Sequence, residues 1–199
     1  MNAHAHAAHP PTSTGLNTWK VGFWTFLGSE TLFFGSFIAT YMIYAGRSVT
    51  GPLPHEVLDI PLTSISTFVL LMSSLAMVIG LAGVQRGSRR AALVGIGMTA
   101  VLGMIFLGFQ AYEFTHFYHV GLTLSTNLFG SSFFILTGFH GAHVTIGVIW
   151  LLLLWLQMFA GRIAPKDALK VEIAGLYWHF VDIVWIAIFT LIYLLQTEG

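Results

Sequence analysis

Five ionisable side chains lie deep inside long apolar stretches of this 199-residue chain. Placing a charge at the centre of a bilayer costs about 2.5–3.5 kcal/mol on insertion scales, so such residues usually serve a function. Because a helix rises about 1.5 Å per residue, these five are predicted to lie at a similar depth near the middle of a membrane. They are Glu30, His140, His143, His179 and Asp182.

The spacing of these residues indicates how they can act together. His140 and His143 are three residues apart, as are His179 and Asp182, so each pair shares one helix face. A carboxylate close to a histidine can hold it protonated or fix its tautomer. Three uses remain open from the residues alone: a structural hydrogen-bonded network across three helices, a proton relay built around Glu30, or a metal or haem site.

Other ionisable residues are predicted outside this mid-membrane layer. Glu113 ends the third apolar stretch, roughly 33 Å along it, which predicts a position at the outer interface. His4, His6 and His9 belong to a polar N-terminal tail, residues 1–18. For this tail a solvated, disordered, cytoplasmic segment is favoured over a metal site.

Composition identifies the elements that must position these groups. The chain is 56% hydrophobic and only 8% charged, so its solvent is predicted to be lipid. Zero net charge argues against nucleic-acid binding, and the absence of Cys excludes disulfides, iron–sulfur clusters and thiolate zinc sites. The predicted fold is an all-α integral membrane bundle, with residues 19–199 as a single domain. Its five transmembrane helices span about residues 20–45, 62–85, 91–115, 128–160 and 171–196.

The basic residues predict the orientation of the bundle. Seven of the eight either precede the first helix or lie in the loops after the second and fourth helices. Arg47 alone lies on the opposite side, so the N-terminus is predicted to be cytoplasmic and the C-terminus outside. A loop over residues 116–127 is expected on the outer side. The seven are Lys20, Arg86, Arg89, Arg90, Arg162, Lys166 and Lys170.

Four segments resemble subunit III of the haem–copper terminal oxidases, which comprise cytochrome c oxidases and quinol oxidases. They are residues 27–34 with Ser29 and Glu30, residues 110–114 with Glu113, residues 130–144 with His140, Gly141 and His143, and residues 177–185 with Trp178, His179, Asp182 and Trp185. The resemblance extends in order over about residues 20–196. It matches the shorter, five-helix bacterial form, which lacks the two extra N-terminal helices of longer members.

This resemblance implies a non-catalytic subunit of a proton-translocating oxidase in a bacterial plasma membrane. It implies direct binding to subunit I, a complex with subunit II and small subunits, contact with membrane lipids, and haem and copper held by subunits I and II. Glu30 falls on the family's carboxyl-reagent-sensitive glutamate, which implies a role in proton uptake, whereas the other site residues are interpreted as structural. Cytochrome c is favoured over quinol as electron donor. A stand-alone membrane metal-binding enzyme or transporter is the alternative from another class.

Overall fold

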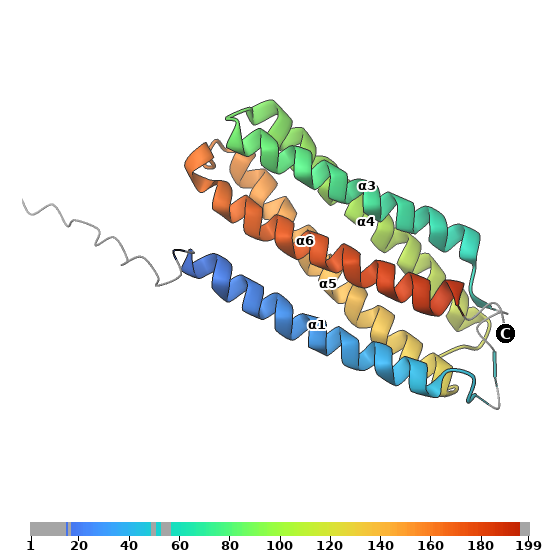
Figure 1. Cartoon of the computed structure of the whole chain (residues 1–199). Coiled ribbons are helices and arrows are strands. Elements are labelled where there is room, and N and C mark those ends of the chain that lie inside the picture. The colour runs from blue at the N-terminus through green and yellow to red at the C-terminus, as the bar shows by residue number, and fades with distance from the viewer. Residues whose placement is uncertain (1–14, 16, 49–50, 53–56, 196–199) are drawn as a thin grey trace, which may run out of the picture.

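The computed structural model describes residues 15, 17–48, 51–52 and 57–195, so the predicted histidine tail lies outside the described residues except at its end. Within this part of the chain, five long helices run side by side (Figure 1). Each is long and apolar enough to cross a membrane, which confirms the predicted all-α class. They are α1 (Thr18–Tyr44), α3 (Ile60–Gln85), α4 (Arg89–His119), α5 (Leu128–Phe159) and α6 (Ala168–Ile188), with a 3₁₀ turn η1 (Pro165–Asp167) before α6 and a π-helical turn η2 (Phe189–Leu194) after it.

Polar residues just outside the apolar stretches set where three of the helices begin. The side chains of Asn17, Asp59 and Asn127 accept hydrogen bonds from backbone N–H groups in the first turns of α1, α3 and α5. Such caps satisfy donors that have no partner within the helix. The helices α1 and α3 therefore start at Thr18 and Ile60, about two residues before the apolar stretches that predicted them.

The helix α4 is longer than its hydropathy indicated. It was expected to end near residue 115, with a loop from residue 116, but it continues to His119. Phe117 is fully buried in this extension, and its ring lies 5.4 Å from that of Phe133 in α5. Aromatic packing against α5 thus stabilises the last turn of α4. The polar residues His116 and His119 had indicated a loop here, and that prediction was wrong.

Small residues allow α3 and α4 to pack closely. A Cβ atom added to Gly95 would lie 2.4 Å from the Cα of Gly80 on α3, so the two backbones touch at this point. A Cβ on Gly103 would lie 2.5 Å from the ring of Trp178, which is fully buried. In lipid, such close packing replaces the hydrophobic effect as the force that holds helices together.

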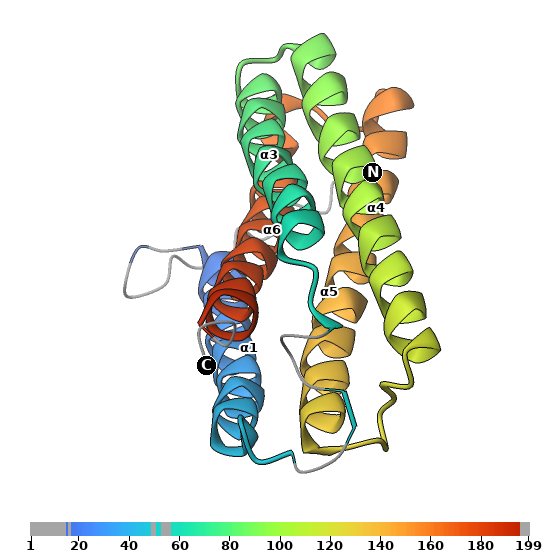
Figure 2. The ribbon, with the colours of Figure 1, turned by 90° about the vertical axis from the view of Figure 1, so that its right-hand side faces the viewer.

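The helix α1 occupies one edge of the bundle. Figure 1 shows α6 between α1 and α3, and the turned view in Figure 2 also shows α1 away from α4. The helix packs on α5 and α6, and it is the least buried of the five spans. Near its start, the Lys20 Nζ lies 2.6 Å from the Glu172 Oε1 on α6. A few polar and aromatic contacts therefore hold α1 against the other helices.

Candidate functional site

Glu30 and His143 face each other between α1 and α5. The His143 Nε2 lies 3.3 Å from the Glu30 Oε2, and the His143 Nδ1 lies 2.8 Å from the backbone oxygen of Phe139. Because a carbonyl oxygen can only accept, Nδ1 carries a hydrogen. One further proton then has two positions: on Nε2 it forms an imidazolium–carboxylate pair, and on Oε2 it forms a neutral pair. The arrangement is suited to holding one proton between the two side chains.

Aromatic rings enclose this pair without closing it completely. The Phe34 ring lies 4.9 Å from the His143 ring, and the Tyr177 ring is stacked 6.5 Å away on the α6 side. The Tyr177 hydroxyl also donates to the backbone oxygen of His143 at 3.1 Å, which holds α5 to α6 at this level. The Glu30 and His143 side chains remain 19% and 16% exposed. The pair is therefore partly accessible from outside this chain.

A second polar cluster joins α3 to α6. The Ser74 hydroxyl lies 2.9 Å from the His179 Nδ1 and also hydrogen bonds to the Asp182 carboxyl group. A hydroxyl has one hydrogen, so Ser74 donates to one of these groups and accepts from the other. Asp182 is buried, whereas Ser74 and His179 are partly exposed. Ser74 thus links His179 and Asp182 of α6 to α3.

His140 lies in the apolar core, apart from both clusters. Its ring is fully buried and stacked on the Trp185 ring at 4.9 Å, with the Phe106 ring 5.9 Å away at a right angle. Neither ring nitrogen has a hydrogen-bond partner among the described residues. Although it is three residues from His143, His140 therefore packs against α4 and α6, whereas His143 meets α1.

Glu113 is buried in a third cluster toward the other end of α4. Its Oε1 accepts a hydrogen bond of 2.9 Å from the Thr63 hydroxyl of α3, and it is also hydrogen bonded to Tyr193. Tyr193 belongs to η2, the π-helical turn that continues α6. Because α4 extends six residues beyond Glu113, this carboxyl group is only 6% exposed and lies inside the bundle. It connects α3, α4 and the end of α6.

The remaining residues carried by the resemblance have visible packing partners. The indole N–H groups of Trp178 and Trp185 donate to the hydroxyls of Ser73 and Thr67 on α3, at 2.8 and 2.9 Å. A Cβ on Gly141 would lie 2.6 Å from the side-chain oxygen of Gln110, so glycine is needed at this contact between α4 and α5. Ser29 is exposed, and its hydroxyl donates to the Phe26 carbonyl one turn earlier, at 2.7 Å.

The five mid-membrane residues therefore do not form one network. Two pair across α1 and α5, two meet α3, and His140 stays separate in the core. Ser74, Thr63 and Tyr193, which complete the clusters, were not predicted from the sequence, because only acidic side chains and histidines stand out in apolar stretches. The signal that could have found the first is the adjacent pair Ser73 and Ser74 in the middle of an otherwise apolar stretch.

Comparison with known proteins identifies the family. The sequence matches the family described as cytochrome c oxidase subunit III over residues 2–197. The chain belongs to the cytochrome c oxidase subunit III family. It is similar to quinol oxidase subunit 3 of Bacillus subtilis, with 41% identity over 90% of this chain and 88% of the relative. It is also similar to cytochrome c oxidase subunit 3 of Alkalihalophilus pseudofirmus, with 39% identity over 96% of this chain and 94% of the relative.

A third relative of this family is cytochrome c oxidase subunit 3 of Bacillus sp. PS3, with 37% identity over 90% of this chain and 86% of the relative. The family and the five spans make the chain a multi-pass membrane protein and subunit III of a haem–copper oxidase. In the described part of the chain, His, Asp and Glu do not form a group of three or more that could hold a metal ion. The polar clusters form contacts between helices of this chain.

Proposed function

We propose that this chain is a non-catalytic subunit III of a cytochrome c oxidase in a bacterial plasma membrane. In this proposal it binds directly to subunit I and stabilises it, and the haem and copper that reduce oxygen belong to subunits I and II. The observation that supports this is the family match over residues 2–197. Seven of the eight basic residues lie in or next to the segments predicted to be on one side of the membrane, which supports a cytoplasmic N-terminus.

Purification from the native membrane tests this assignment. We expect a large haem-bearing subunit to purify together with this chain and to carry the optical spectrum and the iron and copper of the preparation. The same spectrum and metal analysis is then applied to the chain purified alone. Stoichiometric haem, iron or copper in that sample would contradict the proposal and favour the alternative of a stand-alone metal-binding membrane protein.

A quinol oxidase is the second candidate for the complex. It is favoured by relatives named quinol oxidase subunit 3, which are as similar to this chain as the relatives named cytochrome c oxidase subunit 3. Sequencing the subunit II that purifies with this chain distinguishes the two. Copper-ligand Cys and His residues in that subunit identify a cytochrome c oxidase, and their absence there identifies the quinol-oxidising form.

We also propose that Glu30 and His143 handle protons for the complex. The proposal is supported by their separation of 3.3 Å, by the Phe139 carbonyl that fixes the hydrogen on Nδ1, and by their partial exposure. A carboxyl–imidazole pair that retains one proton can act as a local proton reservoir. Glu30→Gln removes the titratable carboxyl group but keeps a polar side chain of the same size.

We expect the Glu30→Gln complex to assemble normally but to take up protons more slowly or to lose activity sooner during turnover. Glu172→Gln is the matched control, because Glu172 of α6 also forms an ion pair with a residue of α1. Its partner is Lys20, near the start of that helix. Turnover rate and active lifetime are measured for both variants over a pH series. Wild-type values for Glu30→Gln at every pH would assign Glu30 a structural role only.

A further inference from the structure

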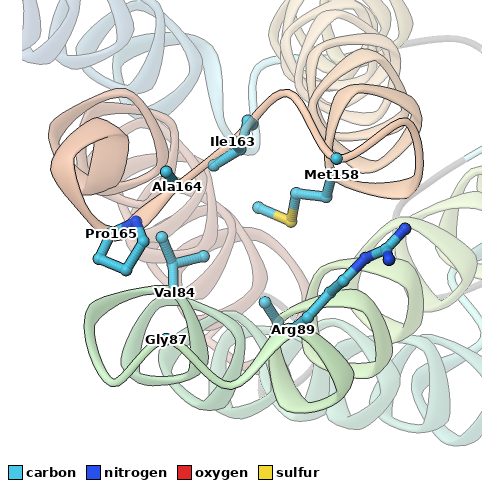
Figure 3. A pocket seen from close by; sticks show the side chains of 9 residues that line it. Val84, Gly87, Arg89, Met158, Ile163, Ala164 and Pro165 are labelled. Carbon is cyan, nitrogen blue, oxygen red and sulfur yellow. The ribbon is translucent and has the colours of Figure 1, made fainter.

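A small cavity lies between two turns at the end of the bundle where α4 and α6 begin. One turn joins α3 to α4, and the other joins α5 to η1 (Figure 3). The cavity has a volume of about 160 Å³, several times what one water molecule needs. Apolar side chains form part of its lining, with Val84, Ala92, Met158 and Ile163 among them.

Basic residues lie at and next to the turns that form this cavity, and several of them have no ion pair within the described part of the chain. Arg89 lines the cavity directly, and the lining residues Gly87, Gly161 and Pro165 are each adjacent in sequence to a basic residue. Lys20 pairs with Glu172, and Lys170 pairs with Asp167, which engages both acidic residues described at this end. Five basic side chains are left without an ion pair in the described region: Arg86, Arg89, Arg90, Arg162 and Lys166.

The guanidinium group of Arg89 is held at the edge of the cavity. One of its terminal nitrogens, Nη2, donates to the backbone oxygen of Phe159 at the end of α5, at 2.7 Å. Figure 3 shows the side chain extending from the start of α4 along one side of the cavity, opposite Pro165. Because a guanidinium group has five N–H donors, further donors remain for an anion. The contact with Phe159 fixes the group before any ligand arrives.

We propose that this cavity binds the phosphate-bearing headgroup of an anionic phospholipid. Both turns lie at the ends of membrane-spanning helices, so the cavity faces the headgroup layer of the bilayer. An anionic phospholipid presents a phosphate close to apolar acyl chains, which matches the Arg89 guanidinium group beside the apolar side chains of the lining. Basic pockets between transmembrane helices recognise such headgroups. The proposal depends on the membrane topology and not on the oxidase role of the chain.

Native mass spectrometry of the full chain in neutral detergent tests the proposal. The chain is titrated with phosphatidylglycerol and, separately, with phosphatidylcholine of the same acyl chains. We expect phosphatidylglycerol to be retained preferentially. Arg89→Gln should lower that affinity about five-fold, the effect of removing one basic residue near an anionic lipid surface. Equal retention of the two lipids by the wild-type chain would overturn the proposal.

Two further variants separate the cavity from general surface charge. Ala164→Leu adds bulk to the cavity without changing the charge, and Ala164 has an extended backbone that accepts any side chain. We expect it to weaken phosphatidylglycerol binding, whereas Arg47→Gln, at the opposite end of the molecule, should leave binding unchanged. An unaffected Ala164→Leu, or an equal loss with Arg47→Gln, would refute a site in the cavity. Displacement of the lipid by millimolar inorganic phosphate would show a phosphate-ion site instead.

Discussion

At the scale of single residues, the contact between Glu30 and His143 links α1 to α5. The two side chains gain from each other only while both are present, because either alone leaves a polar group facing aromatic rings. Hydrogen bonds between membrane helices contribute about 0.6 kcal/mol on average and up to about 1.7 kcal/mol in double-mutant cycles. The contact is therefore important for position and chemistry more than for stability.

A double-mutant cycle measures this coupling. Glu30→Gln, His143→Gln and the combined variant are compared with the wild-type chain by reversible unfolding in mixed micelles. We expect a coupling free energy of about 0.6–1.7 kcal/mol. Additive effects of the two substitutions would mean that the side chains do not interact in the folded chain. The pair Glu30→Gln and Thr40→Val serves as control, because Thr40 bonds only within α1, to the Ser36 carbonyl.

We expect Ser74 to contribute more to stability than a small side chain usually does, because its one hydroxyl hydrogen bonds to both His179 and Asp182. Ser74→Ala removes that hydroxyl and leaves two polar groups of α6 without their contact to α3. A buried polar group that loses its partner costs about 1–3 kcal/mol, so we expect a loss in this range.

The loss is measured as the change in the free energy of unfolding of the full chain in detergent. Ser36→Ala is the control, since Ser36 is exposed on α1 and its hydroxyl donates to the Phe33 carbonyl of the same helix. Equal losses for the two variants would contradict a bridging role for Ser74. Within the complex, His179→Leu should weaken retention of this subunit in detergent, and unchanged retention would count against a structural role of the cluster.

Sequence reasoning identified the ionisable residues of these clusters but not how they are divided among them. Helical spacing places His140 and His143 on one face, yet the angle of about 60° between them around the helix axis is enough for one ring to enter the core and the other to meet α1. Neutral partners such as Ser74 and Thr63 do not stand out, because hydroxyl residues are common in membrane helices. Which groups meet depends on helix packing, and the sequence pattern does not specify it.

At the scale of elements, α3 and α4 make a close backbone contact at a position where only glycine has room. Gly95→Ala would place a methyl group 2.4 Å from the backbone of Gly80, so the helices must separate or the backbone must shift. Forcing extra atoms into a packed contact costs about 1–3 kcal/mol.

Thermal unfolding of the full chain in detergent measures the effect of Gly95→Ala. Gly108→Ala is the control on the same helix, because a Cβ at Gly108 has no atom within 4 Å outside its own turn. We expect a clear fall in melting temperature for the first variant and none for the second. A neutral Gly95→Ala would mean that α3 and α4 are not in backbone contact.

The existence and order of the helices could be predicted, since each is a long apolar stretch between polar segments. Their ends were less predictable. The last turn of α4 contains His116 and His119, and its helical form depends on the burial of Phe117 against α5. The π-helical turn η2 is also invisible in the hydropathy, although it contains Tyr193, which hydrogen bonds to Glu113.

At the scale of the whole molecule, the absence of Cys from the sequence makes the predicted orientation directly testable. Ser88 lies between α3 and α4, and Ser125 lies between α4 and α5; both are exposed. Single Ser88→Cys and Ser125→Cys variants are treated with a membrane-impermeant thiol reagent in cells from which the cell wall has been removed and whose plasma membrane is intact. We expect Ser125→Cys to react in intact cells and Ser88→Cys to react only after permeabilisation. The reverse pattern would invert the orientation.

The position of α1 at the edge of the bundle has a consequence for biosynthesis. Glu30 leaves the ribosome 113 residues before His143, a delay of roughly 6–23 s at the usual 5–20 residues per second. During this interval α1 must enter the translocon and the bilayer with an unpaired carboxyl group. Asp182 is in the opposite situation, because Ser74 was synthesised 108 residues earlier. In a nascent chain that stops before α5, Glu30 therefore lacks its partner His143. When α6 is inserted, by contrast, the Ser74 partner of Asp182 is already in the membrane.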